Sequence, residues 1–127
     1  MEASVYAKDC PSRQLLDRIG DTWSVLTVAL LAAGPLRYTE LAHRIPGISP
    51  KMLTQTLRAL ERDGMVTRTV YPVVPPRVDY ALTSLGRSLL GLVDALQQWA
   101  EQHIGDVAEA RSAYDARLGR PTAETRG

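Results

Sequence analysis

Residues 49–64, SPKMLTQTLRALERDG, predict a short helix whose two ends are both marked in the sequence. Ser49 can cap the first turn through its hydroxyl, and Pro50 suits the first helical position because its missing N–H is not needed there. Gly64 suits the left-handed conformation that commonly follows the last turn of a helix. We therefore expect a helix that begins at Pro50 and ends just before Gly64.

The two faces of this helix have different chemistry. Leucines recur at spacings of three and four residues and should face a core: Leu53, Leu57 and Leu60. The opposite face carries long donors and no carboxylate, with Glu61 and Asp63 expected outside it: Lys51, Thr54, Gln55, Arg58 and Arg62. Arg and Lys can bind guanine edges or phosphates, and Gln can pair with adenine. Because an ordinary solvated face usually mixes charges of both signs, the pattern favours a DNA recognition helix.

A second helix and a tight turn precede the recognition helix. Thr39, followed by Glu40, opens a helix that should run to Arg44, and residues 45–47, Ile-Pro-Gly, form a turn. The order of helix, turn and second helix is that of helix-turn-helix proteins that bind DNA.

An alternating pattern follows Gly64 and predicts two strands, at residues 66–70 and 78–82. The loop between them, from Tyr71 to Arg77, contains three prolines that stiffen it. An ordinary hairpin loop more often uses Asn-Gly or Asp-Gly, so the stiff loop favours a wing. Arg77, at the base of this loop, is its best candidate for a DNA contact.

Four further segments complete the expected fold. A first helix should begin at Pro11 and end near Gly20, and a more apolar helix from Trp23 to Leu31 should form the buried centre. Residues 36–38 form a short extended piece. From Thr83 the helical period returns, in a long helix that continues to about His103.

The long helix carries more apolar surface than one small domain can cover. We expect a second copy of the protein to cover part of it, because symmetric dimers are the commonest oligomers. The alternative is that the stripe packs only on the protein's own second helix. The residues expected at the dimer interface are Leu89, Leu92, Val93, Leu96 and Trp99.

Composition and charge limit the classes of function. The chain has 127 residues and is 45% hydrophobic, which is enough for one core without disulfides or metals. We divide it into an N-terminal arm (1–9), one domain (10–105) and a partly helical, then disordered tail (106–127). Its net charge is only +1, yet residues 37–77 hold seven basic and three acidic side chains. A basic middle suits a protein that offers one face to a polyanion.

Other classes of protein are disfavoured. No apolar run reaches the length of a membrane span, so we expect a cytoplasmic protein with no membrane partner. Cys10 is the only cysteine, which rules out an internal disulfide and a Cys-paired zinc site. The chain has two histidines, no Gly-rich phosphate loop and no serine elbow, and Asp17 and Asp21 belong to a solvated edge beside Arg18. We therefore expect no catalytic residues, no metal and no cofactor.

Seven blocks of sequence carry a family pattern. They are CP at 10–11, IGDTW at 19–23, RYTEL at 37–41, IPGISPKMLTQ at 45–55, DGMV at 63–66, VPPRVDY at 74–80 and LTSLG at 82–86. In this order and spacing they resemble the HxlR-type winged helix-turn-helix transcriptional regulators, which are related to the MarR group. The resemblance implies a mainly α fold with a small β-hairpin wing, a homodimer joined by terminal helices, and binding to a near-palindromic operator.

The resemblance also assigns expected roles to single residues. The helix at 50–62 matches the family's recognition helix, and Pro75, Pro76 and Arg77 match its wing. We expect a repressor that binds double-stranded DNA; a winged-helix module that docks on another protein is the alternative, but such a helix would expose apolar anchors. The DNA-binding candidates are Ser49, Lys51, Thr54, Gln55, Arg58, Arg77, Arg37, Pro75 and Pro76.

Two kinds of signal remain open. Cys10 matches the N-terminal cysteine with which many family members sense oxidants or electrophiles, and a thiol at a helix N-cap near Lys8 and Arg13 gains thiolate character, which Asp9 opposes. The alternative is a packed cysteine without redox consequence. Other members respond to a small organic molecule near the dimer interface. Aromatic residues that could line such a pocket, or simply belong to the core, are Trp23, Tyr38 and Trp99.

Overall fold

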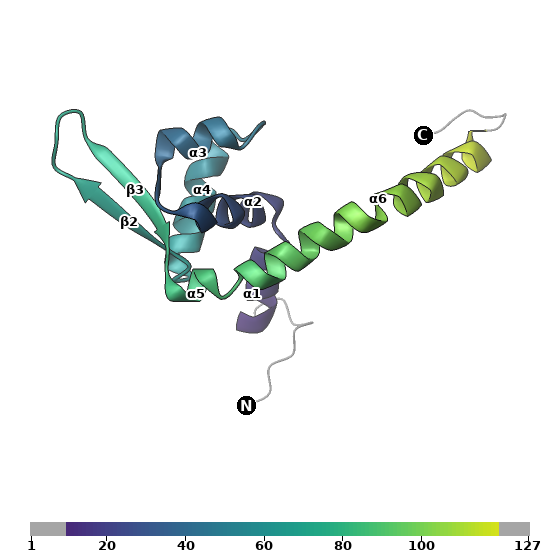
Figure 1. The fold of residues 1–127 in the computed structure, drawn as a ribbon, viewed down its shortest axis with the longest axis horizontal. Coiled ribbons are helices and arrows are strands. Elements are labelled where there is room, and N and C mark those ends of the chain that lie inside the picture. The colour runs from purple at the N-terminus through teal and green to yellow at the C-terminus, as the bar shows by residue number, and fades with distance from the viewer. Residues whose placement is uncertain (1–9, 120–127) are drawn as a thin grey trace. The chain divides into compact units, whose positions relative to one another are not determined.

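The computed structural model describes residues 10–119, and its chain divides into two compact units, Met1–Val93 and Asp94–Gly127 (Figure 1). In the first unit the helices are α1 (Pro11–Gly20), α2 (Thr22–Leu30), the short 3-10 helix η1 (Leu31–Ala33), α3 (Tyr38–Arg44), α4 (Pro50–Arg62) and α5 (Ser84–Arg87). Its strands are β1 (Leu36–Arg37), β2 (Val66–Tyr71) and β3 (Arg77–Leu82). The last helix, α6 (Leu90–Leu118), begins in the first unit and continues through the second. The expected class, mainly α with a small hairpin, is confirmed.

The strands form one antiparallel sheet in the order β1-β3-β2. The hairpin β2–β3 is in register from Val66 opposite Leu82 to Tyr71 opposite Arg77. The short extended piece predicted at residues 36–38 is in fact an edge strand, β1, in which Arg37 lies opposite Asp79. Figure 1 shows the loop end of the hairpin projecting beyond α3 and α4, as a wing does.

The core of the first unit is formed by α2, by the two helices of the helix-turn-helix (α3 and α4) and by the base of the hairpin. The three leucines predicted to face inward on α4 are at most 1% exposed. They pack in one cluster with Val28, Leu31, Leu41 and Ile45. Burial of this apolar face, at roughly 25 cal/mol per Å², is what holds α4 against the rest of the domain.

Capping defines both ends of α4, as predicted. The Ser49 hydroxyl accepts a hydrogen bond of 3.1 Å from the backbone N–H of Met52, and Pro50 is the first helical residue. Gly64 follows the helix with φ of 77°, a conformation that favours glycine. The preceding helix begins at Tyr38, one residue earlier than expected, because the Glu40 carboxylate accepts a 2.8 Å bond from the Arg37 N–H.

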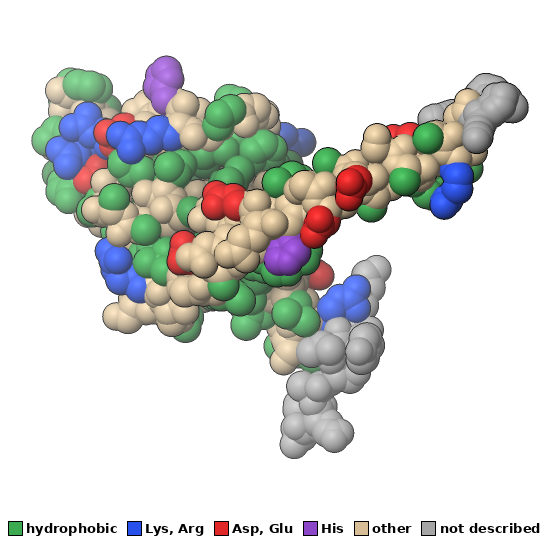
Figure 2. All heavy atoms as spheres, turned by 45° about the vertical axis from the view of Figure 1, so that its right-hand side comes forward, with side chains coloured by type: hydrophobic (Ala, Val, Ile, Leu, Met, Phe, Trp, Pro, Cys, Tyr) green, Lys and Arg blue, Asp and Glu red, His purple; other side chains and the backbone are tan. Residues whose placement is uncertain are grey.

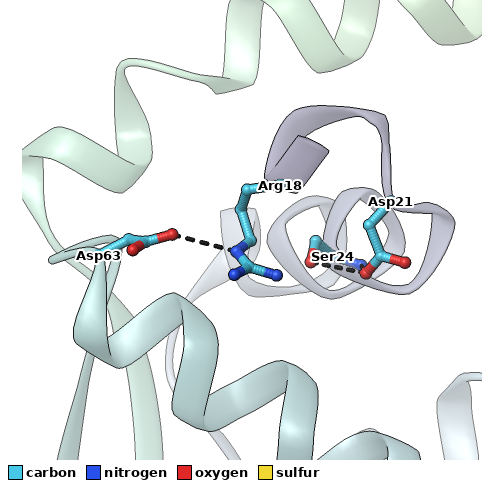
Figure 3. Close-up of polar contacts among 4 residues, drawn as sticks. All are labelled: Arg18, Asp21, Ser24 and Asp63. Atoms are coloured by element: carbon cyan, nitrogen blue, oxygen red, sulfur yellow. Dashed lines mark hydrogen bonds and ion pairs between the residues drawn. The ribbon is translucent and has the colours of Figure 1, made fainter. Parts of the chain in front are cut away.

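A polar contact ties α1 to the end of α4 (Figure 3). Arg18 donates from Nε to Asp63 Oδ2 at 3.0 Å, and both side chains are largely shielded from solvent. Asp21 caps α2 by accepting from the N–H and the hydroxyl of Ser24, at 3.1 and 2.8 Å. Asp17 instead forms an ion pair with Arg13 at 3.6 Å. The two aspartates therefore have separate structural roles.

The long C-terminal helix differs from the expectation in two ways. It is interrupted at residues 88–89, where the Ser88 hydroxyl donates to the Leu85 carbonyl, so α5 and α6 are separate helices. It also extends to Leu118, about four turns beyond His103, so most of the expected tail is helical. The expected N-terminal arm and the last residues of the tail lie outside the described residues.

The expected dimer stripe is divided by the fold. Val93 is only 4% exposed and belongs to the core of the first unit, and Leu89 packs against that core. Leu92, Leu96 and Trp99 are 46, 45 and 58% exposed. Of the five residues expected at the dimer interface, these three are therefore the exposed ones.

Candidate DNA-binding surface

The outward face of α4 presents the polar side chains predicted there. Lys51, Gln55 and Arg58 are exposed. Thr54 is half-buried, and its hydroxyl is 3.2 Å from that of Tyr38. The Ser49 hydroxyl is engaged in the helix cap. Long flexible donors are thus exposed on a helix whose position is set by its buried leucines.

Tyr38 links the two helices of the helix-turn-helix. Its hydroxyl donates to the Pro50 carbonyl oxygen at 3.1 Å and lies at hydrogen-bonding distance from Thr54. The ring, at the start of α3, therefore braces the first turn of α4. The sequence pointed to Tyr38 as an aromatic residue but not to this positioning role.

A polar hollow of about 360 Å³ lies between α4 and the sheet, lined by Thr54, Arg58, Glu61, Arg68 and Tyr80. The expectation that both acids lie off the polar face of α4 holds for Asp63 and is wrong for Glu61, which follows Arg58 by three residues and so shares its side of the helix. Arg68, opposite Tyr80 in the hairpin register, is a basic residue that the candidate list missed. Arg68 could have been identified from its place in an alternating strand that follows the recognition helix.

Arg62, by contrast, faces α1. It lines an open hollow of about 590 Å³ with Pro11, Leu15, Arg18 and other α1 residues. It therefore does not continue the row of donors on α4.

The wing has an apolar tip and a charged base. Val74, in the loop, is 98% exposed, and Pro75 and Pro76 beside it are exposed too. At the base, Arg77 donates from Nε and Nη2 to the two oxygens of Asp79, at 3.0 and 2.9 Å. The guanidinium also lies 4.9 Å from the centre of the Tyr71 ring.

The ion pair at the base of the wing shifts the pKa of both Arg77 and Asp79. The hydrogen bonds and the charge of Asp79 raise the pKa of Arg77 above its ordinary value. The hydrogen bonds from Arg77 lower the pKa of the Asp79 carboxyl, and burial opposes the shift. Both groups are therefore charged throughout the physiological range. Figure 2 shows basic and acidic side chains intermingled in this way at the upper left of the first unit.

Arg37, the remaining basic candidate, lines a second open hollow of about 590 Å³ between the wing and α3. Its other walls are Tyr38, Thr39 and residues 73–78 of the wing, so Arg37 and Arg77 share one hollow. Their common position follows from the sheet, because Arg37 lies opposite Asp79.

Cys10 occupies the N-cap position of α1 and is 8% exposed. The backbone N–H of Arg13, in the first turn of α1, lowers the pKa of the Cys10 thiol; desolvation opposes this effect, and Ser12 adds to it. The direction of this shift is the one expected for a thiol at the N-terminus of a helix. Lys8 and Asp9 lie outside the described residues.

The three aromatic residues expected to line an effector pocket divide between the two units. Trp23 and Tyr38 pack against the core cluster of the first unit. In the second unit Trp99 stacks on His103, with ring centres 4.6 Å apart. An effector pocket at these residues stays a prediction.

Two negative observations apply to residues 10–119. No group of three His, Cys, Asp or Glu side chains in this range could hold a metal ion. Nor is any helix in it long and apolar enough to cross a membrane.

A helix-turn-helix with an exposed polar second helix, followed by a β-hairpin with a stiff loop, defines the winged helix-turn-helix class of proteins. A model of the HxlR-like helix-turn-helix family matches residues 18–108. The chain belongs to this family of DNA-binding transcriptional regulators, as the resemblance implied. MarR-family regulators are among its structural neighbours.

The chain is 43% identical to the uncharacterized HTH-type transcriptional regulator YtfH of Escherichia coli (strain K12) over 87% of each chain. It is similar to the solved structure of ytfH from Salmonella typhimurium, with a TM-score of 0.81 and 41% identity over 87% of this chain and 99% of that one. It is also similar to the redox regulator HypR in its oxidized form, with a TM-score of 0.67 and 41% identity over 73% of this chain and 96% of that one.

Proposed function

We propose that the protein represses transcription as a homodimer bound to a near-palindromic operator, with α4 of each subunit in a major groove. The observation that carries the proposal is the outward face of α4, where Lys51, Gln55 and Arg58 are exposed on a helix capped by Ser49 and braced by Tyr38. A helix held rigidly by packing can place donors at base edges without a cost for ordering its backbone.

The three donors have different expected roles. Gln55 and Arg58 reach base edges, where each can bond in a bidentate way, and Lys51 at the start of the helix binds a base edge or a phosphate. Two-fold symmetry then requires two half-sites separated by about 10 bp or a multiple of it.

A second copy of the chain is the proposed partner of α6. Leu92, Leu96 and Trp99 recur at helical spacing and are about half-exposed, which is unusual for large apolar side chains in a monomer. Figure 2 shows further hydrophobic side chains exposed along α6. A self-complementary contact between two such stripes would bury them.

The proposed signal is an oxidant or electrophile that reacts at Cys10. The likeness to a redox regulator and the lowered pKa of the thiol both support this. A peroxide would convert the thiolate to a sulfenic acid, and Cys10 of the second subunit could then displace water and close a disulfide between subunits. The bond would favour one arrangement of the dimer and so change the spacing of the two recognition helices.

Fluorescence anisotropy with DNA from beside the protein's own coding region tests the proposal. We expect tight, salt-sensitive binding that Arg58→Ala weakens and Arg111→Ala, which removes an equal charge from α6, leaves unchanged. Oxidant should release the wild-type protein but not Cys10→Ser. Binding that ignores oxidant would leave the DNA-binding role and remove the thiol signal; absence of binding would favour the protein-docking alternative.

A further inference from the structure

The guanidinium of Arg77 is held by three contacts with two residues at the base of the wing. Asp79 accepts from Nε and from Nη2, and the Tyr71 ring lies against the guanidinium. This contrasts with Lys51 and Arg58 on α4, which are exposed donors. Arg77 thus has one defined orientation, with its Nη1 donors outside the pair with Asp79.

Asp79 can hold the guanidinium of Arg77 because of its position in strand β3. Residues 77 and 79 of β3 are two apart, so their side chains lie on the same face of the strand. The Asp79 side chain is only 13% exposed, which limits its movement. Arg37 lies opposite it on β1, and its charge also lowers the pKa of Asp79.

Two basic residues line the open hollow between the wing and α3. Arg37 and Arg77 line it, with Tyr38, Thr39 and the wing loop. The nearby acid Glu40 is held by the Arg37 backbone N–H and contributes to the raised pKa of Arg77. Each carboxylate accepts at least one hydrogen bond within the protein, and Arg37 and the Nη1 group of Arg77 are the basic donors beside the hollow.

We propose that this hollow binds a phosphate of the DNA backbone and that Asp79 is a positioning residue, which aims Arg77 at that phosphate. The proposal rests on the DNA-binding function proposed above. It assigns the charged base of the wing to the DNA backbone and leaves sequence recognition to α4.

Two effects of the carboxylate oppose each other. Its charge repels a phosphate, but that charge is compensated by Arg77 at 2.9 Å and is largely shielded from solvent. Its bonds also remove the rotamer freedom that Arg77 would otherwise lose on binding, and they leave Nη1 directed outward. Because a bidentate, stacked guanidinium is already ordered, we expect positioning to outweigh repulsion.

The test compares DNA affinity and its salt dependence for Arg77→Ala, Asp79→Asn and the double variant. Arg77→Ala should weaken binding about tenfold on all sequences and reduce the salt slope by about one unit. Asp79→Asn should weaken binding by about three- to tenfold although it removes a negative charge. The double variant should bind no more weakly than Arg77→Ala, because Asp79 acts through Arg77.

Glu109→Gln is the matched control, since it removes an equal charge from an exposed position on α6, where no DNA contact is proposed. It should leave affinity unchanged or raise it slightly. If Asp79→Asn also leaves affinity unchanged or raises it, the carboxylate only repels DNA and the proposal is wrong. The proposal would also be wrong if the affinity loss of the double variant equalled the product of the two single losses.

Arg77→Lys covers the case in which Asp79→Asn does not fold. Lysine keeps the charge but cannot form the fork, so it should lose most of what Arg77→Ala loses; wild-type affinity would refute positioning. If Arg58→Ala weakens binding and Arg77→Ala does not, this proposal fails while the DNA-binding function stands. If the wild-type protein binds no DNA, the function itself fails.

Discussion

Replacing Gly86 with alanine should destabilise the protein strongly. Gly86 is buried in α5, at the junction between the hairpin and the last turn of α4. A Cβ at this position would overlap the carbonyl oxygen of Met65 and lie 3.0 Å from the carbonyl carbon and 3.1 Å from Leu82 Cδ2. The obstacle is mostly backbone, so rotation of a side chain cannot relieve it.

The surrounding hydrogen bonds make the junction rigid. The Met65 carbonyl accepts from the Thr83 N–H at 3.0 Å, and the Thr83 hydroxyl accepts from the Gly86 N–H at 3.0 Å and donates to the Gly64 carbonyl. Moving Met65 away from a new methyl group would break the first of these bonds. Overpacking costs about 1–3 kcal/mol, and a lost buried hydrogen bond about 1 kcal/mol. Alanine's better helix propensity offsets up to about 1 kcal/mol, which leaves a net loss of about 1–4 kcal/mol.

Urea unfolding followed by circular dichroism measures this free energy. Gly91→Ala is the control, because a Cβ there meets nothing within 4 Å, and it should leave the free energy of unfolding unchanged or raise it by up to about 1 kcal/mol. A Gly86→Ala protein whose free energy of unfolding lies within about 0.5 kcal/mol of wild type would refute the steric reasoning.

Three further predictions concern the cap, the brace and the thiol. Ser49→Ala removes the bond to the Met52 N–H and should lower the free energy of unfolding by about 1 kcal/mol in urea titrations, whereas an unchanged midpoint would mean that water replaces the cap. Tyr38→Phe keeps the ring but loses the bonds to Pro50 and Thr54, so DNA affinity measured by anisotropy should fall about fivefold with unfolding changed by no more than about 1 kcal/mol; equal affinity would contradict the bracing role. Because the Arg13 N–H lowers the pKa of Cys10, the alkylation rate of this thiol should reach half its maximum at a lower pH in the folded protein than in urea. The free energy of unfolding should then rise as pH increases between these two midpoints. Identical midpoints would remove this argument for a reactive thiol.

Local patterns predicted the bounds and the buried face of α4, because the signals for them lie within the helix or directly beside it. Its cap, its first proline, its buried leucines and its terminal glycine are all short-range features, and each is confirmed. The strands were predicted for the same reason. Contacts between elements were less accessible: the sequence shows an aromatic residue at 38, but only the packing of α3 on α4 makes its hydroxyl a brace.

The end of the chain shows how a periodic pattern can mislead. Apolar residues continue at helical spacing from Leu85 onward, which favoured one uninterrupted helix. The pattern does not record that Ser88 bonds to the Leu85 carbonyl, nor that Gly86 must approach Met65 closely. The first of these contacts is local and the second is tertiary; α5 ends after one turn, and α6 begins as a separate helix. Val93 is then used in the core, although periodicity alone placed it with the exposed stripe.

The candidate site in the wing also depends on contacts that a local pattern does not give. Arg77 was predicted to contact DNA because of its charge and its place beside a stiff loop, and no role was predicted for Asp79. Yet the two-residue spacing in a strand already puts both side chains on one face, so their pairing was a readable signal. What spacing could not decide is whether the acid cancels the arginine or orients it. The shielding of Asp79, the Tyr71 ring and the neighbouring Arg37 favour orientation, and only the sign of the Asp79→Asn effect on DNA affinity separates the two.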